Sequence, residues 1–483
     1  MKKIILLLCV LSVFPFFTSC KNEEVFTPCY SLGVTLNEDM TIDGQMTYSF
    51  SNEYQKNLSK IEFNLYPNAY RENASVKPVF DSDISACYEN GFSEGKIDIL
   101  AVKNSGKDAV FEVSGENMQT LKVWLNDCLD LGEKTEVYIK FKVTLPNANH
   151  RLGYGENTVN LSWFYPIASV YENGEFYSNV YYPAGDPFYS ECADYKVKLN
   201  VPSSFVVASS LPFDKTEWIG GNTEYVLSGN SVRDVAFFLS KKYNVIKKSA
   251  GKTQVTYYYY NDLNPEKTLD TACKSLNFFS SLYGEYPYSE YSVCQGDFIY
   301  GGMEYSGLSL IADNANSFTD YVVAHETAHQ WFHGIVGFNE SEIGFLDEGL
   351  AEFSTAYFMG KYKLENREYI DYINDAKNSY LSIKSSIDKV YGEKPPIMKR
   401  NLKQFRTNAE YVMISYNRSE VMIDSLYNYL GEKKFFKTVK KFVKEKAFKN
   451  ANEEDFISAV EKKKRGAGNL LRSFIRGERE ISL

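Results

Sequence analysis

Residues 321–352 read YVVAHETAHQWFHGIVGFNESEIGFLDEGLAE, and several of their side chains stand at spacings that one metal ion can use. His325 and His329 are four residues apart, so on an α-helix they share a face and can turn their imidazoles toward one point. Glu326 is rotated by about 100° from His325, which places its carboxylate beside the metal, where a general base for water belongs. The segment therefore predicts a helix with two metal ligands and a base.

A third ligand is expected from the next helix, whose apolar periodicity starts at Leu346 after a connection from Gly334 to Gly344. Glu348 is the first candidate in that helix. Two histidines, one glutamate and an open position for water make the donor set of a hydrolytic site with one Zn²⁺ per chain. An accidental HExxH string is a poor alternative, because a chain with four histidines in 483 residues holds about 0.002 such strings by chance.

His333 follows His329 by four residues and could extend the same helical face. Three successive helical turns diverge too far for three imidazoles to share one small ion. We therefore assign His333 a structural or supporting role and do not count it among the ligands.

The string HETAH, followed by eighteen residues and then Glu348 in FLDEGLAEF, resembles the M1 family of zinc aminopeptidases in the gluzincin group. A second element lies shortly upstream, where residues 301–305 (GGMEY) resemble the GxMEN exopeptidase signature of the family, with Tyr305 in place of its Asn. The two elements together are more specific than either alone. The family resemblance implies a zinc-dependent aminopeptidase that removes the N-terminal residue from peptides.

The GGMEY element is expected to bind the substrate. Glu304 would supply a carboxylate to the free α-ammonium of a peptide, a group that needs a charge partner once it is desolvated. Gly301 and Gly302 allow close approach of a peptide backbone, which can lie along this strand as though added to a sheet. With Met303, they complete the predicted substrate-binding set.

Residues 416–419 (YNRS) resemble the Tyr-x-Lys-Gly element of the family. The resemblance implies that Tyr416 donates its phenol to the oxyanion of the tetrahedral intermediate. Tyr411 is the competing assignment among 38 tyrosines.

The region from about residue 27 to 245 is strand-like. Apolar and polar residues alternate at 58–66, 137–143 and 195–201, and each stretch is bounded by turn-forming residues. Helical periodicity then begins at 269–284. These patterns predict an all-β domain followed by a mainly helical one.

The resemblance makes this fold class more specific: a multidomain β + α protein with an N-terminal antiparallel β-sandwich or saddle domain and a thermolysin-like, mainly α catalytic domain. We place these domains at 29–246 and 247–483. Within the second, residues 291–311 are expected to form two edge-prone strands around the glycine bend at 301–302. The long C-terminal helical domain of many family members is missing, so we expect a more open cleft.

The N-terminus predicts export. Residues 1–19 have two lysines, a short apolar core and small polar residues, which is typical of a signal peptide. Residues 18–20 (TSC) resemble a lipobox, so Cys20 is expected to be lipidated and residues 20–28 to form a tether. An exported lipoprotein in the cell envelope follows, on the outer membrane and facing either the periplasm or the outside. Ordinary secretion with a free Cys20 is the alternative.

Composition limits the partners. The net charge of −9 argues against nucleic acid. Peptides with a free N-terminus are the expected substrates, and contact with the membrane is expected only through the lipid. The basic stretch 433–449 is interpreted as the solvated face of a core-packed helix. Six cysteines beyond Cys20 lack metal-ligand spacing and are compatible with disulfides or with buried free thiols.

Two alternatives to an aminopeptidase remain open. A thermolysin-type zinc endopeptidase shares the HExxH string and the distal glutamate, although Glu304 argues against it. A non-catalytic surface binding protein with a degenerate site is the alternative from another class.

Overall fold

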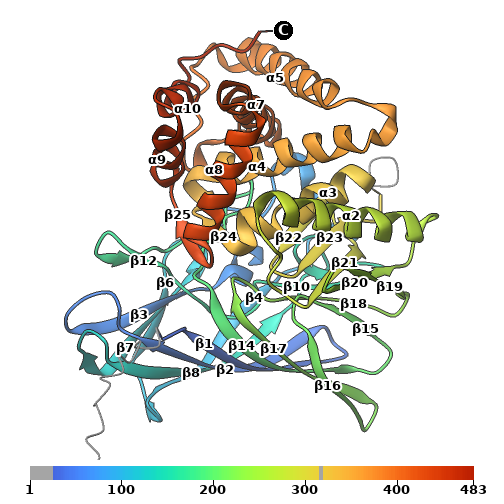
Figure 1. The fold of residues 1–483 in the computed structure, drawn as a ribbon. Helices are drawn as coiled ribbons and strands as arrows, with labels where there is room; N and C mark the ends of the chain where they lie inside the picture. Colours follow the sequence, from blue (N-terminus) through green and yellow to red (C-terminus); the bar gives the residue numbers. More distant parts are fainter. Residues whose placement is uncertain (1–25, 315–318, 483) are drawn as a thin grey trace, which may run out of the picture.

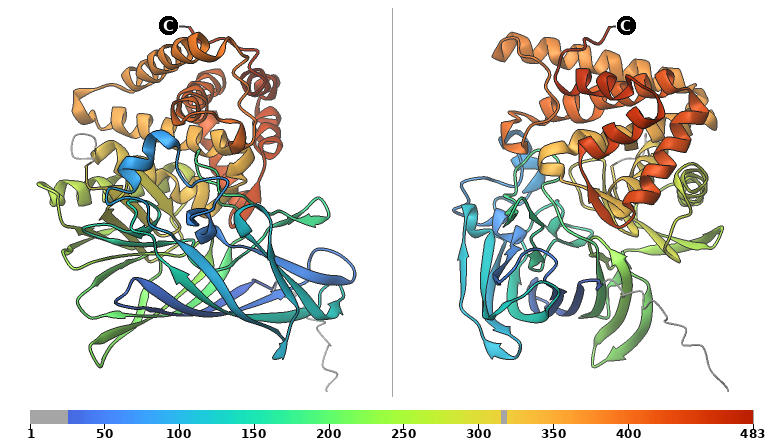
Figure 2. Two further views of the ribbon diagram at one scale, coloured as in Figure 1. Left: turned by 180° about the vertical axis from the view of Figure 1, so that it is seen from behind. Right: turned by 60° about the vertical axis from the view of Figure 1, so that its left-hand side comes forward.

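The computed structural model describes residues 26–314 and 319–482 (Figure 1). An N-terminal part made of β-sheets forms the base of the molecule, and a mainly helical part, coloured yellow to red, lies above it. The helices stay on one side of the β-sheets in all three views (Figures 1 and 2). The predicted order of a β-domain followed by a mainly helical domain is confirmed. The proposed signal peptide and Cys20 lie outside the described residues.

The largest sheet of the β-domain has eight strands. Buried and exposed positions alternate along its strands, so one face packs on the core and the other faces water. Neighbouring strands are antiparallel as expected, except that β1 and β14 run parallel. The strands in spatial order are β16 (Phe213–Ile219), β17 (Asn222–Val232), β14 (Ala193–Pro202), β1 (Cys29–Leu36), β2 (Thr41–Ser51), β8 (Lys134–Thr144), β4 (Lys96–Asn104) and β5 (Lys107–Asp108).

Two four-stranded sheets and a small hairpin complete the β-domain. The first sheet comprises β15 (Val206–Ser209), β18 (Ala236–Ser240), β10 (Val159–Ser162) and β9 (Leu152–Tyr154). The second comprises β11 (Ile167–Ala168), β3 (Leu58–Asn64), β7 (Thr120–Leu129) and β6 (Phe111–Ser114). The hairpin is β12 (Tyr171–Glu172) with β13 (Glu175–Phe176). A short helix, α1 (Ile84–Cys87), precedes β4.

Tyrosines account for much of the β-domain core. Tyr30 stacks on Tyr195 with ring centroids 4.9 Å apart and packs edge-on against Tyr165. The hydroxyl of Tyr165 donates to that of Tyr195 over 3.1 Å, so these buried rings also satisfy their polar ends. Part of the tyrosine excess in the sequence is therefore packing.

A five-stranded sheet begins the second domain. Its strands in spatial order are β19 (Asn244–Ala250), β20 (Thr253–Tyr259), β21 (Glu290–Gly296), β23 (Leu308–Ala312) and β22 (Gly302–Tyr305). The chain leaves β18 at Ser240 and enters this sheet at Asn244, so the predicted boundary between residues 246 and 247 falls inside β19.

The expectation of two edge-prone strands at 291–311 is wrong, because the segment forms three strands. Helix α2 (Pro265–Tyr283) crosses over between β20 and β21, which makes that pair parallel and places β21 inside the sheet. Strand β23 inserts beside β21, so only β22 is left at the edge. The position of Glu304 on an edge strand follows from this order.

The helices pack above this sheet. They are α3 (Thr319–Ala328), α4 (Glu340–Lys361), α5 (Tyr369–Tyr391), α6 (Asn408–Tyr411), α7 (Ser419–Leu430), α8 (Glu432–Lys446), α9 (Glu453–Lys463) and α10 (Ala467–Ile475). Two short strands, β24 (Val336–Phe338) and β25 (Lys449–Ala451), pair in parallel among them. Along α8 the buried positions are Phe, Val and one Thr, and none of its lysines is buried, as the interpretation of this basic stretch requires.

Within the described part of the chain, the six cysteines from Cys29 to Cys294 are all free thiols. Four of them are buried, which favours the interpretation as buried free cysteines over disulfides. In the same residues, none of the helices combines the length and the apolar character needed to cross a bilayer.

Candidate active site

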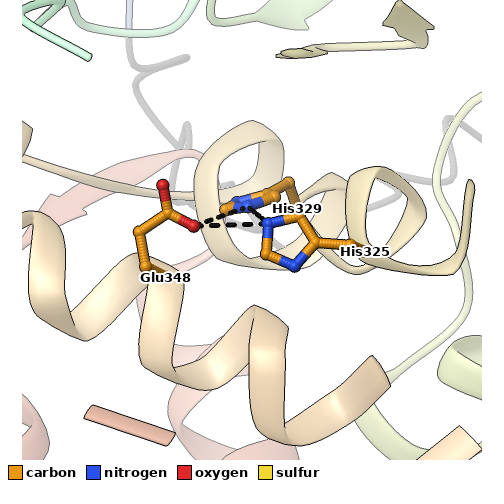
Figure 3. A group of neighbouring side chains, drawn as sticks. All are labelled: His325, His329 and Glu348. Carbon is orange, nitrogen blue, oxygen red and sulfur yellow. Dashed lines mark hydrogen bonds and ion pairs between the residues drawn. The ribbon is translucent and has the colours of Figure 1, made fainter. Parts of the chain in front are cut away.

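Two helices bring three candidate metal ligands to one point (Figure 3). His325 lies on α3 and His329 directly follows that helix, so their Nε2 atoms approach to 3.0 Å. Oε2 of Glu348, from α4, lies 3.3 Å from Nε2 of His325 and 3.4 Å from Nε2 of His329. All three side chains are buried. The structure therefore brings together the three residues predicted to bind the metal.

The donor geometry fits zinc. Tetrahedral Zn²⁺ with bonds of 2.0–2.1 Å separates its ligand atoms by about 3.4 Å, which is close to the spacing of the three atoms here. Oε2 of Glu348 accepts no well-formed hydrogen bond from the described residues, although it is buried. An unsatisfied buried carboxylate oxygen facing two imidazole nitrogens is the environment that a divalent cation stabilises.

The charges around the ligands also favour a cation. Burial alone would raise the pKa of Glu348, but its contacts with His325 and His329 lower it to about 2. Burial disfavours a protonated His329, yet the carboxylates of Glu304 and Asp347 outweigh this effect and raise its pKa well above the ordinary value. The buried carboxylates around the ligands thus outnumber the basic side chains that could neutralise them. A metal ion would supply the missing positive charge.

Acidic side chains lie beside both histidine ligands, and one of them orients His329. Nδ1 of His329 lies 2.9 Å from Oδ1 of Asp347, which leaves Nε2 turned toward the metal point. Oε1 of Glu352 lies 3.3 Å from Nδ1 of His325, but this nitrogen forms no hydrogen bond with the described residues. The sequence patterns did not point to Asp347 or Glu352, although Asp347 precedes a predicted ligand and could have been found from that position.

The chain after His329 departs from the expected helix. Helix α3 ends at Ala328, and residues Gln330–Ile335 form an irregular π-type turn. The side chain of Gln330 stabilises this turn by donating to the carbonyl of Tyr305 and accepting from the amide of Gly307. The ring nitrogens of His333 lie against Asp234 and Glu340, and His333 is not part of the group formed by His325, His329 and Glu348, which agrees with its supporting role.

The connection to α4 is also shorter than expected. Helix α4 begins at Glu340, not near Leu346, because β24 occupies part of the presumed loop and the acidic residues at 340 and 342 suit a helix N-terminus. Glu348 therefore lies inside the helix, five residues beyond a kink at Ile343 (φ −134°, ψ 27°).

Glu326 lies against the glycine bend. A Cβ added to Gly302 would be 2.4 Å from Oε1 of Glu326, whereas one added to Gly301 would meet only a Val322 methyl at 3.7 Å. Burial raises the pKa of Glu326 well above its usual range, while His329 opposes the shift. The carboxylate can thus lie in this place beside the metal ligands because residue 302 has no side chain.

A cavity of about 270 Å³ opens beside the ligands and is the candidate substrate pocket. Gly301, Gly302 and Glu304 line it, together with His325 and Glu326. Met303 does not line the cavity, because side chains alternate along β22 and its sulfur lies 3.1 Å from Nε of Arg151 instead. Three of the four residues predicted to bind substrate therefore face the cavity.

Glu304 is suited to receive a cation. The residue is 4% exposed, and its Oε1 has no hydrogen-bond partner among the described residues. Burial raises the pKa of Glu304 well above its usual range, with the nearby His329 opposing the shift. An arriving ammonium group would stabilise this carboxylate in its ionised form.

Asp186 is a pocket residue that no sequence pattern indicated. It lies in the loop between β13 and β14 of the β-domain and forms an ion pair with the buried Arg151. Gly185 precedes it with φ 57°, and a Cβ there would meet the hydroxyl of Tyr411 at 2.4 Å. The segment carries no chemical motif, so only the glycine-aspartate pair could have drawn attention to it.

Both candidate tyrosines line the cavity, but at different distances from the ligands. Tyr416 donates to Oε1 of Glu348 over 2.5 Å, and its ring stacks on His325. The hydroxyl of Tyr411 instead lies over Gly185 and Gly344. Tyr416 is therefore the one in direct contact with two of the metal ligands.

Comparison with known proteins identifies the relatives of this chain. Residues 267–476 match the Peptidase family M1 domain. Aminopeptidase 2, mitochondrial, from Saccharomyces cerevisiae is 28% identical over 214 residues, which cover 41% of this chain and 22% of that protein. Aminopeptidase 2 from Candida albicans is 24% identical over 403 residues, which cover 76% of this chain and 41% of that protein. The chain thus spans less than half the length of these relatives.

Solved structures share the whole described architecture. An M1 zinc metallopeptidase from Deinococcus radiodurans aligns over 94% of both chains with a TM-score of 0.66 and 17% sequence identity. A variant of that enzyme, bound to a Tyr-Ser-Ala substrate, aligns over the same shares with a TM-score of 0.65. At this identity the likeness establishes the fold, and the two-domain arrangement of β-domain and helical domain is common to both proteins.

Proposed function

Residues 267–476 form a peptidase family M1 domain, and on this premise we propose that the chain is a zinc-dependent aminopeptidase. It would hydrolyse the N-terminal residue from peptides, with one Zn²⁺ held by His325, His329 and Glu348. Peptides with a free N-terminus are the substrate class. The fit of the donor set to tetrahedral zinc supports the metal, and the cavity beside it supports the substrate.

The observation that carries the proposal is the placement of Glu304. Its carboxylate lines the same cavity as His325 and Glu326, is buried and has an oxygen without a hydrogen-bond partner in the described residues. Such a group is costly unless a cation binds to it. The α-ammonium of a peptide supplies that cation. Its binding next to the metal would place the carbonyl of the first residue at the metal, so that one residue is released.

The edge position of β22 supports the same orientation. Strand β22 pairs with β23 on one side, and Gly302 and Glu304 face the cavity. A peptide that extends along the free edge can add main-chain hydrogen bonds to the sheet. These contacts would align the first peptide bond with Glu326 and hold it there.

Each catalytic side chain has a separate task. When bound, zinc supplies Lewis-acid chemistry, which polarises a carbonyl and lowers the pKa of water. Glu326 would accept the proton of the attacking water at its carboxylate as the C–O bond forms, which gives a tetrahedral intermediate. It would then pass this proton to the leaving amine as the C–N bond breaks. Tyr416 would turn its O–H from Glu348 to the carbonyl oxygen and donate to the developing negative charge.

A substrate profile tests the proposal. Aminoacyl-fluorophore substrates should be hydrolysed, a chelator should abolish the activity and added Zn²⁺ should restore it. Peptides with N-acetyl groups should be cleaved far more slowly than the same peptides with free amines. Equal rates for both would favour the thermolysin-type endopeptidase, and zinc binding without turnover of either would favour a binding protein.

We also propose that the protein is a lipoprotein of the cell envelope, tethered through Cys20. The lipobox-like residues 18–20 and the preceding apolar segment support this. A Cys20→Ala variant should move from the membrane fraction to the soluble fraction, while an exposed-thiol control, Cys128→Ala, should stay in the membrane fraction. Unchanged fractionation of Cys20→Ala would contradict the tether.

A further inference from the structure

His333 lies between two carboxylates that come from different domains. Its Nε2 is 2.7 Å from Oδ2 of Asp234, and its Nδ1 is 3.0 Å from Oε1 of Glu340. Asp234 belongs to the loop between β17 and β18 of the β-domain, and Glu340 is the first residue of α4. All three side chains are at least 96% buried. With an acceptor at each ring nitrogen, the imidazole bridges the two domains as a double donor.

The β-domain also forms a hydrogen bond with the backbone of His333. Nε of Arg233 donates to the carbonyl of His333 over 2.7 Å, and Nη1 of Arg233 donates to Oδ1 of Asn450 over 2.6 Å. The paired residues 233 and 234 therefore hold both the main chain and the ring of His333. This fixes the irregular turn that follows the metal-binding helix.

The same loop reaches the strand that carries Glu304. Oδ1 of Asp234 accepts from the amide of Ser306 over 2.7 Å, and the amide of Arg233 donates to the hydroxyl of Ser306 over 3.3 Å. Ser306 directly follows β22, the edge strand with a single neighbour in the sheet. Asp234 thus joins the end of this strand to the ring of His333.

The other carboxylate connects the ring to the metal ligands. Glu340 and Asp347 lie on α4, and Asp347 orients His329. One polar atom from each of Glu304, His333, Glu340 and Asp347 lies within 4.8 Å of the others. In this cluster of four, His333 is the one base among three carboxylates.

We propose that His333 is a positioning residue, which bridges Asp234 and Glu340 and thereby fixes Glu304 relative to the metal ligands. The inference rests on the proposed aminopeptidase function for its kinetic readout, but not for its metal readout. Without the ring, Asp234 and Glu340 lose their shared donor in a buried site, and the carboxylates of the cluster repel one another. Strand β22 and helix α4 would then shift apart, which changes both amine binding and the support of His329.

The first measurement is zinc affinity, determined by competition with a fluorescent chelator. A His333→Gln variant is expected to bind Zn²⁺ about 10–100-fold more weakly, the usual effect of losing a supporting partner of a metal ligand. The matched control is Tyr177→Phe, which removes a 3.2 Å hydrogen bond between the same two domains, from Tyr177 of the β-domain to Glu342 of α4. The control should bind Zn²⁺ as the wild type does. Equal affinities for His333→Gln and the wild type would overturn the proposal.

The second measurement is a double-mutant cycle with Glu304. His333→Gln is expected to lower kcat/KM for free-amine peptides by about 10–100-fold in the wild-type background. With both backgrounds assayed at saturating Zn²⁺, so that weaker metal binding does not contribute, a His333 that acts through Glu304 should change kcat/KM by less than about threefold in a Glu304→Gln background. Losses that multiply would overturn the link to Glu304.

A rescue variant separates positioning from a general loss of stability. Asp234→Asn keeps an acceptor for the amide of Ser306, removes one buried charge and presents a donor to a glutamine at position 333. The double variant His333→Gln/Asp234→Asn should therefore recover part of the lost zinc affinity. No recovery would contradict the bridge. Where His333→Gln fails to fold, Asp234→Asn alone is expected to weaken zinc binding, and an unchanged affinity would count against the proposal.

Metal stoichiometry gives a further decisive outcome. The wild type should bind one Zn²⁺, and a second ion bound at the cluster of Glu304, His333, Glu340 and Asp347 would overturn the hydrogen-bonded bridge. Failure of the aminopeptidase assay would leave the affinity difference between His333→Gln and Tyr177→Phe measurable, so the two hypotheses fail separately.

Discussion

The carboxylate of Glu326 occupies the space where a side chain at residue 302 would begin. A Cβ on Gly302 would lie 2.4 Å from Oε1 of Glu326, which is shorter than any stable contact between these atoms. Because the clash falls on the far end of a flexible side chain, the backbone can remain in place while the carboxylate moves. The glycine therefore controls the position of the proposed base more than the stability of the fold.

We expect Gly302→Ala to lower kcat by about 100-fold, since a displacement of about 1 Å at a catalytic group has an effect of this size. Thermal stability and zinc content should stay close to those of the wild type. Gly301→Ala is the matched control, because its Cβ would make only an ordinary contact with Val322. Equal kinetic losses in the two variants would show that the Glu326 contact is not the cause.

Substitutions of Glu326 and Glu352 should have different effects, one on turnover and the other on metal binding. Glu326→Gln removes the proton acceptor and is expected to reduce kcat by about 10²–10⁴-fold with zinc retained. Glu352→Gln removes the carboxylate charge 3.3 Å from Nδ1 of His325 and should reduce zinc affinity by about 10–100-fold. Steady-state kinetics at saturating Zn²⁺, together with chelator competition, distinguish the two. Substantial turnover by Glu326→Gln would remove it from the base role.

Substitutions of the two tyrosines that line the cavity should also differ in their effects on turnover. Tyr416→Phe should reduce kcat by about 10²–10³-fold with little change in zinc content, as expected for the loss of one donor to an oxyanion. Tyr411→Phe should have a smaller effect, because its hydroxyl lies over Gly185 and Gly344, whereas that of Tyr416 donates to Glu348. An equal or larger loss in Tyr411→Phe would transfer the role to that residue.

Glu304→Gln keeps the shape of the amine anchor and removes its charge. We expect kcat/KM for free-amine peptides to fall by about 10–100-fold, since a buried ammonium would lose its counter-ion, about 1.5–3 kcal/mol for a charged hydrogen bond. The slow cleavage of N-acetylated peptides should be unchanged. If acetylated and free peptides lose activity equally, Glu304 does not bind the amine.

The features predicted correctly from the sequence depend on local periodicity. Ligand pairing by His325 and His329 requires only one helical turn, and the alternation in β8 and β14 requires only a strand. Residues four apart on a helix, or two apart on a strand, share a face whatever the rest of the chain does. The domain order and the histidine part of the site can therefore be predicted from the sequence alone.

The features that were missed depend on contacts between distant segments. Asp186 reaches the cavity from the β-domain, so no spacing relative to HETAH identifies it. The sheet order that places β23 inside and β22 at the edge depends on the pairing of β23 with β21, two strands that are not consecutive in the chain. The contact between Glu340, at the start of α4, and His333 joins two side chains that the irregular turn brings together. Sequence periodicity carries no information on such pairings.

The scarcity of histidine gives the chain a spectroscopic consequence. Of four histidines in 483 residues, His325, His329 and His333 lie in or beside the proposed zinc site, and His150 is buried against Tyr70. Ring N–H protons held between carboxylates exchange slowly with water and resonate far downfield in proton NMR spectra. Selective ¹⁵N-histidine labelling would thus give a spectrum in which nearly every imidazole signal reports on the zinc site, and titration with Zn²⁺ could be followed ring by ring without any substrate.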